Sequence, residues 1–457
     1  MNDNKKTIYI AIEIKAREFL SHIVLSILAI KNNYRVIIGS QSSIIEYILK
    51  KPSFGGILLH KGGIHENTIE DVKKKINSYA VLDQEVVPGW NKKFYERIIP
   101  DRYHIKTQKK IDLYLAANKN ISKIAKKTLY YIKNKIFFVG MPSFDLCRPK
   151  YFNLHKNKIL EIKKKYDNFI LFNSNFGSIT PLGINQRLEY LPWGRKKKNM
   201  KKFISEEKIK YKDDFDDFNV TCKFLKEIAL LTKKKIIIRP HPAESIIAWN
   251  HKFKNCENIC VEKPIDSVIP WIYACNGLLH RGCSTSYFGY LINKPIGVLK
   301  IFKSSIILPQ YKELLAEKIS RKIYNSKDFI KWLNENKFNN KINIYENLGF
   351  EKKAESVDKI INLFNKTKTD PEYSYNILNR RNNYFLHYYL IIKHNMLKNL
   401  IIFLTRVYLL KKNINKYEIT PKIGEGIKST EIKKIFNVTK NKFKKIKQIG
   451  LNLVEII

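Results

Sequence analysis

Short apolar runs alternate with helical patterns through the first 140 residues. Residues 19–30 and 44–49 fit a helical period, and Ser42 or Ser43 is the expected N-cap of the second of these helices. The apolar runs have the length and the β-branched content of buried strands, and they cover residues 7–14, 34–38, 55–63, 79–82, 112–116 and 135–140. This alternation predicts a parallel sheet with helices on both faces.

The same pattern starts again after Pro149. Helices are expected over residues 218–231 and 286–291, and a basic segment at 195–198 is expected in a mobile insertion. Strands are expected at residues 168–172, 236–238, 277–280 and 296–299. The predicted fold class is therefore α/β, with two Rossmann-like domains, residues 1–160 and 161–350, that face a shared cleft.

Beyond residue 350 the chain changes character and becomes rich in lysine and tyrosine with a helical pattern. We expect a basic helical extension over residues 351–457, whose most apolar part is residues 384–410. Two interpretations are open for this extension. It contacts an anionic membrane surface peripherally, or it packs as a helical tail on the α/β body, which we favour slightly.

Charge and composition narrow the classes of function. The chain of 457 residues has 85 Lys and Arg against 41 Asp and Glu, a formal net charge of +44, and it is 44% hydrophobic. That hydrophobic content excludes a wholly disordered protein. The charge reflects either general lysine enrichment or attraction to nucleic acid, an acidic membrane or a nucleotide-linked substrate. Because we find no nucleic-acid-binding helix or aromatic platform, we expect no nucleic acid partner.

The cysteines and the N-terminal residues bear on the compartment. Six cysteines without any CxxC pair are too few for a disulfide scaffold and do not fit a zinc ribbon or a redox dithiol. The first residues lack the apolar core and cleavage site of a signal peptide, and no window of about 19 residues is free of charge. We therefore expect a cytoplasmic protein, with peripheral contact at the inner face of the membrane if the extension binds lipid.

Two loops of the second unit follow predicted strands and carry groups suited to binding a phosphate. In the first, two prolines brace His241, and Arg239 adds a planar cation. In the second, small hydroxyl residues follow a glycine at a helix start, a pattern that forms an anion cradle or an ordinary N-cap. His241 is a candidate catalytic residue, and the candidate donor-binding residues are Arg239, Pro242, Glu244, His280, Gly282, Ser284, Thr285 and Ser286.

Carboxylates follow a strand of the first unit. Asp83 and Glu85 come directly after residues 79–82, where either could deprotonate an acceptor hydroxyl or could lie in a solvated turn. Arg17 could position a substrate carboxylate or pair with Glu18. Further substrate-positioning candidates are Glu18, Asn173 and Asn175. No DxD-like metal site accompanies these loops, so we expect neither a metal nor a cofactor.

The chain resembles the bacterial surface carbohydrate biosynthesis proteins, which look like glycosyltransferases of the two-domain GT-B type. The resemblance covers about residues 7–345 and rests on IEIKAREF with the Gly39-Ser40 turn, VLDQE, VGMPSFDLCRPKY, ILFNSNFG, IIIRPHPAE and HRGCSTSYFGYLINKP. The last two segments are also similar to the His-Pro and Ser/Thr motifs of bacterial sialyltransferases and capsule Kdo transferases. That similarity implies that His241, Ser284 and Thr285 hold a CMP-activated sugar and that Asp83 or Glu85 is the base.

Three hypotheses about function remain at this stage. The first is transfer of a sugar from a CMP-linked donor to a surface glycan or a lipid-linked acceptor. The second keeps the fold but transfers glycerol phosphate or ribitol phosphate from a CDP donor, because loops of the RPHP type also occur in such enzymes. The third is a non-enzymatic basic protein that binds a membrane or nucleic acid.

Overall fold

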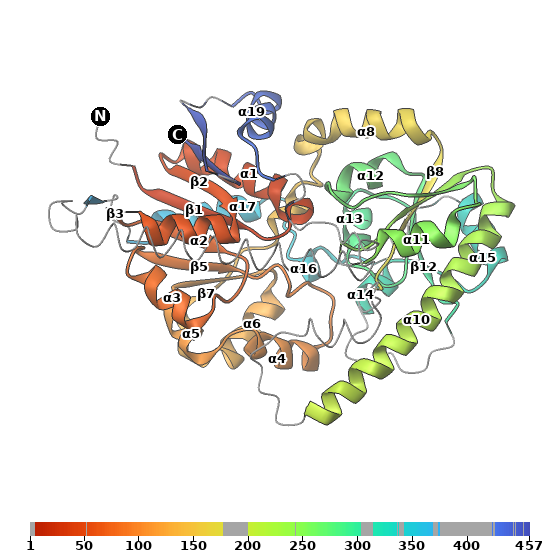
Figure 1. The fold of residues 1–457 in the computed structure, drawn as a ribbon, viewed down its shortest axis with the longest axis horizontal. Coiled ribbons are helices and arrows are strands. Elements are labelled where there is room, and N and C mark those ends of the chain that lie inside the picture. Colours follow the sequence, from red (N-terminus) through yellow and green to blue (C-terminus); the bar gives the residue numbers. More distant parts are fainter. Residues whose placement is uncertain are drawn as a thin grey trace, which may run out of the picture.

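The structure is a computed structural model, and it describes residues 5–176, 200–302, 314–335, 337, 342–368, 373–374, 423 and 426–457, apart from the single positions 52, 243, 442, 444 and 451. The expected basic insertion at 195–198 and the apolar segment at 384–410 lie outside these residues. Two sheets organise the fold, one in each half of the molecule (Figure 1). The fold is therefore α/β with two Rossmann-like domains, as the hydrophobic pattern predicts.

The first sheet has eight strands in the order β15-β16-β2-β1-β4-β5-β6-β7. Its six consecutive strands from β2 to the edge strand β7 run parallel, and they are β1 (Thr7–Ile12), β2 (Arg35–Ser40), β4 (Ile57–His60), β5 (Ser78–Leu82), β6 (Leu113–Ala116) and β7 (Ile136–Phe138). The chain moves outward from β1 to β2 and then returns to the other side of β1 to form β4. A topological switch point therefore lies between β1 and β4.

Alternation along these strands divides the first domain into two packed layers. Ile8, Ile10 and Ile12 of β1 belong to one buried cluster, whereas Tyr9 and Ala11 belong to the other. Successive strand residues point to opposite faces, so a run of buried apolar residues needs helices on both sides. Those helices are α1 (Lys15–Lys31), α2 (Gln41–Lys50), α3 (Glu66–Lys73), α4 (Lys92–Asp101), α5 (Ile105–Lys110) and α6 (Lys119–Thr128), with the 3-10 helix η1 (Tyr130–Lys135) after α6.

The second sheet has six strands in the order β10-β9-β8-β11-β12-β13, and its paired strands are parallel. These strands are β8 (Phe169–Asn173), β9 (Lys235–Arg239), β10 (Ile259–Val261), β11 (Gly277–His280), β12 (Ile296–Leu299) and β13 (Arg321–Ile323). This is the Rossmann order 3-2-1-4-5-6, so its switch point lies between β8 and β11. The helices around it are α8 (Phe152–Tyr166), α10 (Met200–Leu231), α11 (Ile246–Phe253), α12 (Val268–Ala274), α13 (Thr285–Leu291), α14 (Leu314–Lys318) and α15 (Ser326–Glu335).

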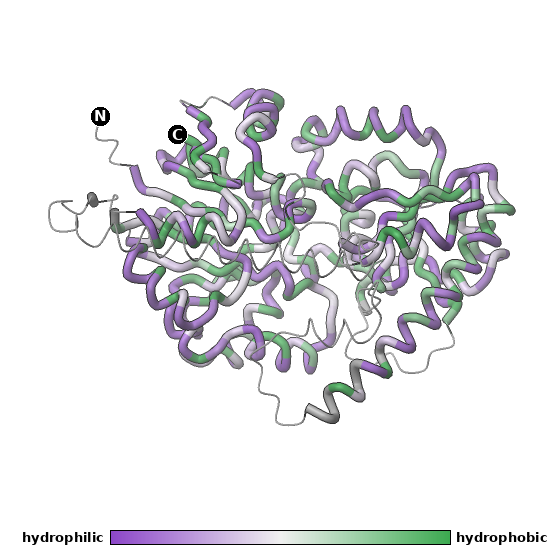
Figure 2. The backbone as a smooth tube through the Cα atoms, in the orientation of Figure 1, coloured by the Kyte–Doolittle hydropathy of each residue, from purple (hydrophilic) through white to green (hydrophobic). Residues whose placement is uncertain are grey.

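The junction between the domains is short and is crossed twice. The chain leaves the first domain through α7 (Pro142–Asp145) and η2 (Pro149–Tyr151) and comes back through α16 (Tyr345–Leu348). Arg148 holds the two crossings together, since its guanidinium donates to Asp145 and to the carbonyl oxygens of Glu351, Lys352 and Ala354 at 2.7–3.1 Å. Figure 2 shows hydrophobic residues concentrated inside both domains, whereas hydrophilic residues dominate α8.

The described part of the region beyond residue 350 contains strands as well as the expected helices. α17 (Ser356–Lys366) and α19 (Ser429–Val438) join the cluster of α1, and the short β14 (Tyr373–Ser374) pairs with β3 (Ser53–Phe54). The hairpin of β15 (Ile446–Gly450) and β16 (Leu453–Ile456) extends the first sheet antiparallel to β2. Here the structure differs from the sequence-based expectation, because the last residues complete the sheet of the first domain.

A strand overlaps each predicted strand range, but the short strands β3, β10, β13, β14, β15 and β16 were not predicted. Two predicted helices also differ locally. Ser40 caps α2 by accepting the backbone N–H of Ser43, whereas the expected cap was Ser42 or Ser43. The helix expected over residues 218–231 begins at Met200. No helix of the described residues is both long enough and apolar enough to cross a membrane.

Candidate active site

The candidate residues gather where the carboxyl ends of the two sheets meet. In the first domain, Arg17 follows β1, Lys61 follows β4 and Glu85 follows β5, and these three strands are neighbours in the sheet. In the second domain, His241 follows β9, which pairs with β8 beside the switch point. Ligands of open α/β sheets bind at the carboxyl ends of the strands, at such points.

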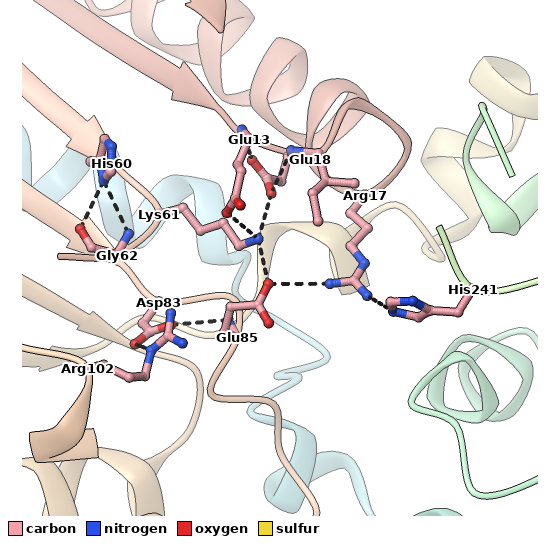
Figure 3. A network of polar contacts seen from close by, with 11 residues as sticks. Glu13, Arg17, Glu18, His60, Lys61, Gly62, Asp83, Glu85, Arg102 and His241 are labelled. Carbon is pink, nitrogen blue, oxygen red and sulfur yellow. Dashed lines mark hydrogen bonds and ion pairs between the residues drawn. The ribbon is translucent and has the colours of Figure 1, made fainter. Parts of the chain in front are cut away.

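Arg17 joins the two domains. One guanidinium nitrogen, Nη2, lies 2.7 Å from Nε2 of His241, and Nη1 lies 3.4 Å from Oε1 of Glu85 (Figure 3). An arginine can only donate hydrogen bonds, so Nε2 of His241 is the acceptor and the neutral ring carries its proton on Nδ1. Arg17 is therefore the direct link between the acidic group of the first domain and the imidazole of the second.

Lys61 is a buried cation surrounded by carboxylates. Its side chain is 3% exposed, and Nζ lies 2.5 Å from Glu85, 2.9 Å from Glu13 and 3.3 Å from Glu18. Burial alone would lower the pKa of Lys61, but Glu18, Glu85 and Glu13 outweigh it and raise that pKa. Sequence reasoning did not select Lys61, although its position between a buried strand and Gly62-Gly63 was a usable signal.

The charge states at the domain junction follow from these contacts. Burial alone would raise the pKa of Glu85, but Lys61 and then Arg17 outweigh it and lower that pKa to about 2. Burial lowers the pKa of His241, and Arg17 lowers it further, to about 4. At neutral pH the junction therefore holds an ionised carboxylate, a neutral imidazole and an arginine that bonds both.

The structure separates the two acidic candidates. Asp83 is 3% exposed, and its carboxylate accepts hydrogen bonds from Arg102 Nε at 2.7 Å, from the Tyr103 hydroxyl at 2.5 Å and from the backbone N–H of Glu85 at 3.1 Å. These contacts fix the turn that carries Glu85. Glu85, which is 38% exposed at its side chain, is the one of the two that bonds Arg17 at the domain junction.

Glu18 lies in a different setting from the one expected. It is fully buried, accepts the backbone N–H groups of Glu13 and Ile14 at 2.8 and 3.3 Å, and contacts Lys61. Its carboxylate thus binds the free N–H groups at the start of α1, where a negative charge is stabilised. Neither substrate positioning nor a pair with Arg17 fits this geometry, so the expectation for Glu18 is corrected.

Hydrogen bonds to the buried Ser174 and Glu244 hold the loop that carries His241. Ser174 Oγ donates to Glu244 at 2.6 Å and accepts the backbone N–H of His241 at 3.1 Å. Glu244 also accepts from the N–H groups of Phe176 and Trp249, and burial raises its pKa to about 7. Glu244 therefore supports the loop, and Pro242 follows His241 in a turn. Sequence reasoning missed Ser174, whose position just after a buried strand was the available signal.

The side chain of Arg239 does not lie beside that of His241 at the domain junction. Its guanidinium pairs with Asp266 at 2.7 Å and lies over the ring of Trp271, and its side chain is 4% exposed. Arg239 and His241 are separated by Pro240, and the side chain of the last strand residue turns into the protein. The expectation that Arg239 binds the donor is therefore corrected: this residue anchors the end of β9.

His280 shapes the second loop from inside. Its Nδ1 accepts the backbone N–H groups of Gly282 and Cys283 at 2.9 and 3.1 Å, so the proton lies on Nε2, which is 2.9 Å from Ser320 Oγ. His280 is fully buried, and burial lowers its pKa to about 3. Gly282 has a φ of +83°, a conformation that favours glycine. His280 is therefore a positioning residue of this turn.

Buried polar atoms near the second switch point lack partners among the described residues. They are both side-chain amide atoms of Asn173 and the hydroxyl oxygens of Thr285 and Ser286. Asn175 links the two loops by donating to the carbonyl oxygen of Gly282 at 3.3 Å, and Ser284 makes no capping bond with its side chain. A buried polar atom without a partner is unfavourable, and a bound ligand would supply one.

A separate cavity of about 640 Å³ opens beside β13 at the edge of the second sheet. None of the residues at the domain junction lines it; its lining is Glu317, Lys318, Ser320, Arg321, Lys322, Tyr324, Asp328 and Ile342. In the described part of the chain, no group of three or more His, Cys, Asp or Glu side chains could hold a metal ion.

No protein-family model matches the chain, and no curated protein matches it. Among solved structures it is similar to the UDP-GlcNAc 2-epimerase of Methanocaldococcus jannaschii, with a TM-score of 0.47 and 14% identity over 79% of this chain and 99% of that chain. It is also similar to the wall teichoic acid polymerase TagF, with a TM-score of 0.42 and 12% identity over 79% of this chain and 89% of that chain. A UDP-N-acetylglucosamine 2-epimerase from Rickettsia bellii has a TM-score of 0.43 and 10% identity, over 79% of this chain and 96% of that chain.

Proposed function

We propose that this chain is a metal-independent glycosyltransferase of the GT-B type that transfers a sugar from a CMP-linked donor to a surface glycan or lipid-linked acceptor. The observation that carries the proposal is the contact of Arg17 with both His241 and Glu85 across the domain junction. It unites an imidazole, a cation and a carboxylate at the carboxyl ends of both sheets. The motif resemblance of the His241 and Ser284–Ser286 loops supports the cytidine donor.

The second domain offers side chains that suit the binding of a nucleoside diphosphate or monophosphate. His241 is held by Ser174 and carries an Nδ1–H that can donate to a phosphate oxygen. The side-chain polar atoms of Asn173, Thr285 and Ser286, which have no partner among the described residues, can complete their hydrogen bonds with the donor. His241 is held in place by the buried Ser174 and Glu244, so it can stabilise the charge that develops on the leaving phosphate without rearranging.

The first domain offers the base. With Lys61 and Arg17 both bound, Glu85 is a weak base, because its pKa lies at about 2. An anionic donor that enters beside His241 competes with Glu85 for Arg17, since a guanidinium binds phosphate in the same forked geometry as a carboxylate. Loss of Arg17 raises the pKa of Glu85, so the donor itself makes Glu85 a better base. The base thus gains strength only when a donor is present.

The transfer step follows from these roles. Glu85 takes the proton of the acceptor hydroxyl as the acceptor oxygen forms its bond to the anomeric carbon of the donor sugar. The bond between that carbon and the phosphate oxygen breaks, and the nucleotide leaves with the electron pair. Arg17 and His241 stabilise the negative charge on the leaving oxygen.

Calorimetric titration of CMP, CDP and UDP into the full chain tests the donor assignment. We expect CMP to bind and His241→Ala to weaken that binding at least about tenfold, the loss expected when a hydrogen bond to a charged group is removed. His251→Ala is the matched control, because His251 is an exposed histidine on α11 of the same domain. Absence of binding by any nucleotide, or equal binding by both variants, would refute the proposal.

Analysis of the product separates the reaction from its alternative. A glycosidic bond formed with release of CMP is the expected result. A phosphodiester in the product, with release of CMP from a CDP-alditol, would keep the site but replace glycosyl transfer with phosphotransfer.

A further inference from the structure

An exposed aromatic and apolar group lies on the surface of the first domain. Tyr130 is 71% exposed, Ile105 is 52% exposed and Tyr131 is 49% exposed. Ile105 begins α5, and the two tyrosines begin η1, which packs against α5 and α6. We call these three residues, together with Lys106, Lys109, Lys126, Lys127 and Lys133, the basic aromatic patch.

Side-chain contacts hold the patch together. The rings of Tyr130 and Tyr131 meet edge to face with their centroids 5.9 Å apart. The ammonium group of Lys109 lies 4.8 Å from the ring centroid of Tyr131, and that of Lys133 lies 5.7 Å from the ring of Tyr130. One lysine of α5 and one of η1 therefore each lie over one of the two rings.

The segments that form the patch carry a concentrated positive charge. Residues 105–110 and 119–135 contain nine lysines and no aspartate or glutamate. Lys110 pairs with Glu70 at 2.8 Å, Lys106 approaches Glu66 at 3.7 Å, and Lys135 approaches Asp112 at 3.7 Å. The exposed Lys109, Lys126, Lys127 and Lys133 have no carboxylate at ion-pair distance within the described part of the chain. Their charge is thus available to a partner.

We propose that the basic aromatic patch is the surface by which the protein docks on an anionic phospholipid bilayer. Tyrosine suits the interface between lipid and water because its ring is apolar and its hydroxyl is polar. Lysines beside it can bury their aliphatic stems in that interface while their ammonium groups meet lipid phosphates. An exposed isoleucine adds apolar area that a nucleic acid backbone would not use, and one face of each tyrosine ring is already covered by a lysine, which leaves little room for base stacking.

This assignment is independent of the proposed transfer reaction, and it places membrane contact on the first domain. The sequence alone suggested the region beyond residue 350 for that role. The patch needs no insertion of a helix, because its attraction combines apolar burial with about 1 kcal/mol for each lysine close to an anionic surface.

Cosedimentation of the full chain with vesicles of one part phosphatidylglycerol to two parts phosphatidylcholine tests the assignment. We expect binding to these vesicles, little binding to pure phosphatidylcholine, and weaker binding at high salt. Replacing Lys109, Lys126, Lys127 and Lys133 with serine should lower the partition coefficient at least about tenfold, since each lysine contributes about 1 kcal/mol at the surface. The double variant Tyr130→Ser/Tyr131→Ser should lower it several-fold, by removing the two rings from the interface.

Matched variants on the second domain control for nonspecific binding to vesicles. Leu230 and Leu231 are 87% and 53% exposed at the end of α10, so Leu230→Ser/Leu231→Ser removes a comparable apolar surface. Serine at the exposed Lys223, Lys233, Lys235 and Lys254 removes the same charge. Equal loss in both sets would overturn the assignment. So would the absence of vesicle binding by the wild type, or binding of a single-stranded RNA that depends on the patch while vesicles do not bind.

Discussion

Removal of the Arg17 guanidinium should separate catalysis from stability. Arg17→Met keeps an unbranched side chain but removes the contacts to Glu85 at 3.4 Å and to His241 at 2.7 Å. The side chains of Arg17 and Glu85 are 39% and 38% exposed, so solvent screens the pair and its loss should lower the free energy of unfolding by only about 0–1 kcal/mol. Loss of one preorganised donor to the leaving phosphate should lower kcat about 10²–10³-fold.

The titration of the site gives a second measure of the same substitution. Burial is the largest cause of the lowered pKa of His241 and Arg17 is the next, so the pKa should rise in Arg17→Met and remain below 6.5. The pKa of Glu85 should also rise, and Lys61 should keep it below 4.5. The imidazole can be followed by NMR between pH 3 and 7, with the buried His280 as an internal reference that Arg17 does not contact.

Three results would refute this reasoning. An unchanged titration of His241 would show that Arg17 does not reach it in solution. A fall in the free energy of unfolding of several kcal/mol would make Arg17 a structural residue. Retention of full turnover by Arg17→Met would remove it from the reaction, whatever the titration shows.

Four further predictions concern the buried charges, the hairpin and the metal. Lys61→Met leaves three carboxylates without their buried cation and should lower the free energy of unfolding by about 3–5 kcal/mol in chemical denaturation, whereas Lys74→Met at an exposed pair should leave it nearly unchanged. Stability should fall as the pH drops from 6.5 to 4. The folded state lowers the pKa of four histidines to about 4 or about 3, so each of them takes up a proton when the protein unfolds in this pH range. These histidines are His60, His155, His241 and His280. Glu244 and Asp145, whose pKa values burial raises to about 7 and about 6, act in the opposite direction, so thermal melts should report a net proton uptake smaller than the histidines alone would give, and a flat profile would contradict the assigned charge states. Gly39→Ala places a Cβ 2.5 Å from the carbonyl oxygen of Asn452 and should destabilise the first domain by about 1–3 kcal/mol with faster proteolysis of the β15–β16 hairpin; unchanged proteolysis would argue against its pairing with β2. Transfer should continue in EDTA, and recovery of lost activity by magnesium alone would contradict the metal-independent mechanism.

Local pattern was sufficient to predict the central buried strands and the loops that follow them, but not the short outer strands β10 and β13 or the β15–β16 hairpin. The strands are buried runs such as Thr7–Ile12 and Ser78–Leu82, and a buried strand of a parallel sheet has few alternatives once helices flank it. The position of a loop after a strand then implies the edge of the sheet on which it lies. For this reason Arg17, Glu85 and His241 could be selected from sequence, and the structure brings these three together.

The direction of each side chain could not be predicted in the same way. Arg239 and His241 are two residues apart in one motif, yet Arg239 turns inward to Asp266 whereas His241 meets the first domain. Asp83 and Glu85 differ similarly, because the carboxylate of Asp83 accepts hydrogen bonds from Arg102 and Tyr103, which lie about twenty residues later at the end of α4. Such partners are set by tertiary packing, and no spacing rule in one sequence identifies them.

The C-terminal hairpin illustrates the same limit at longer range. Its two short strands alternate only weakly, and their partner strand lies at Arg35–Ser40 near the other end of the chain. Pairing between strands more than 400 residues apart leaves no signal in the local sequence, although it determines how one edge of the sheet is covered. The hairpin covers the outer edge of β2, and an uncovered edge strand is a template for aggregation.

The positions of Lys61 and Arg17 together argue that domain closure and charge are coupled at this site. Lys61 belongs wholly to the first domain and binds Glu85 whether or not the domains approach. Arg17 binds Glu85 from the same domain but reaches His241 only when the second domain is close. Opening of the junction would therefore free the imidazole of its cation and leave Glu85 doubly paired, whereas an anion beside His241 would draw Arg17 toward the second domain. If so, a nucleotide should favour the closed arrangement in the wild type, by small-angle scattering, and should lose that effect in Arg17→Met.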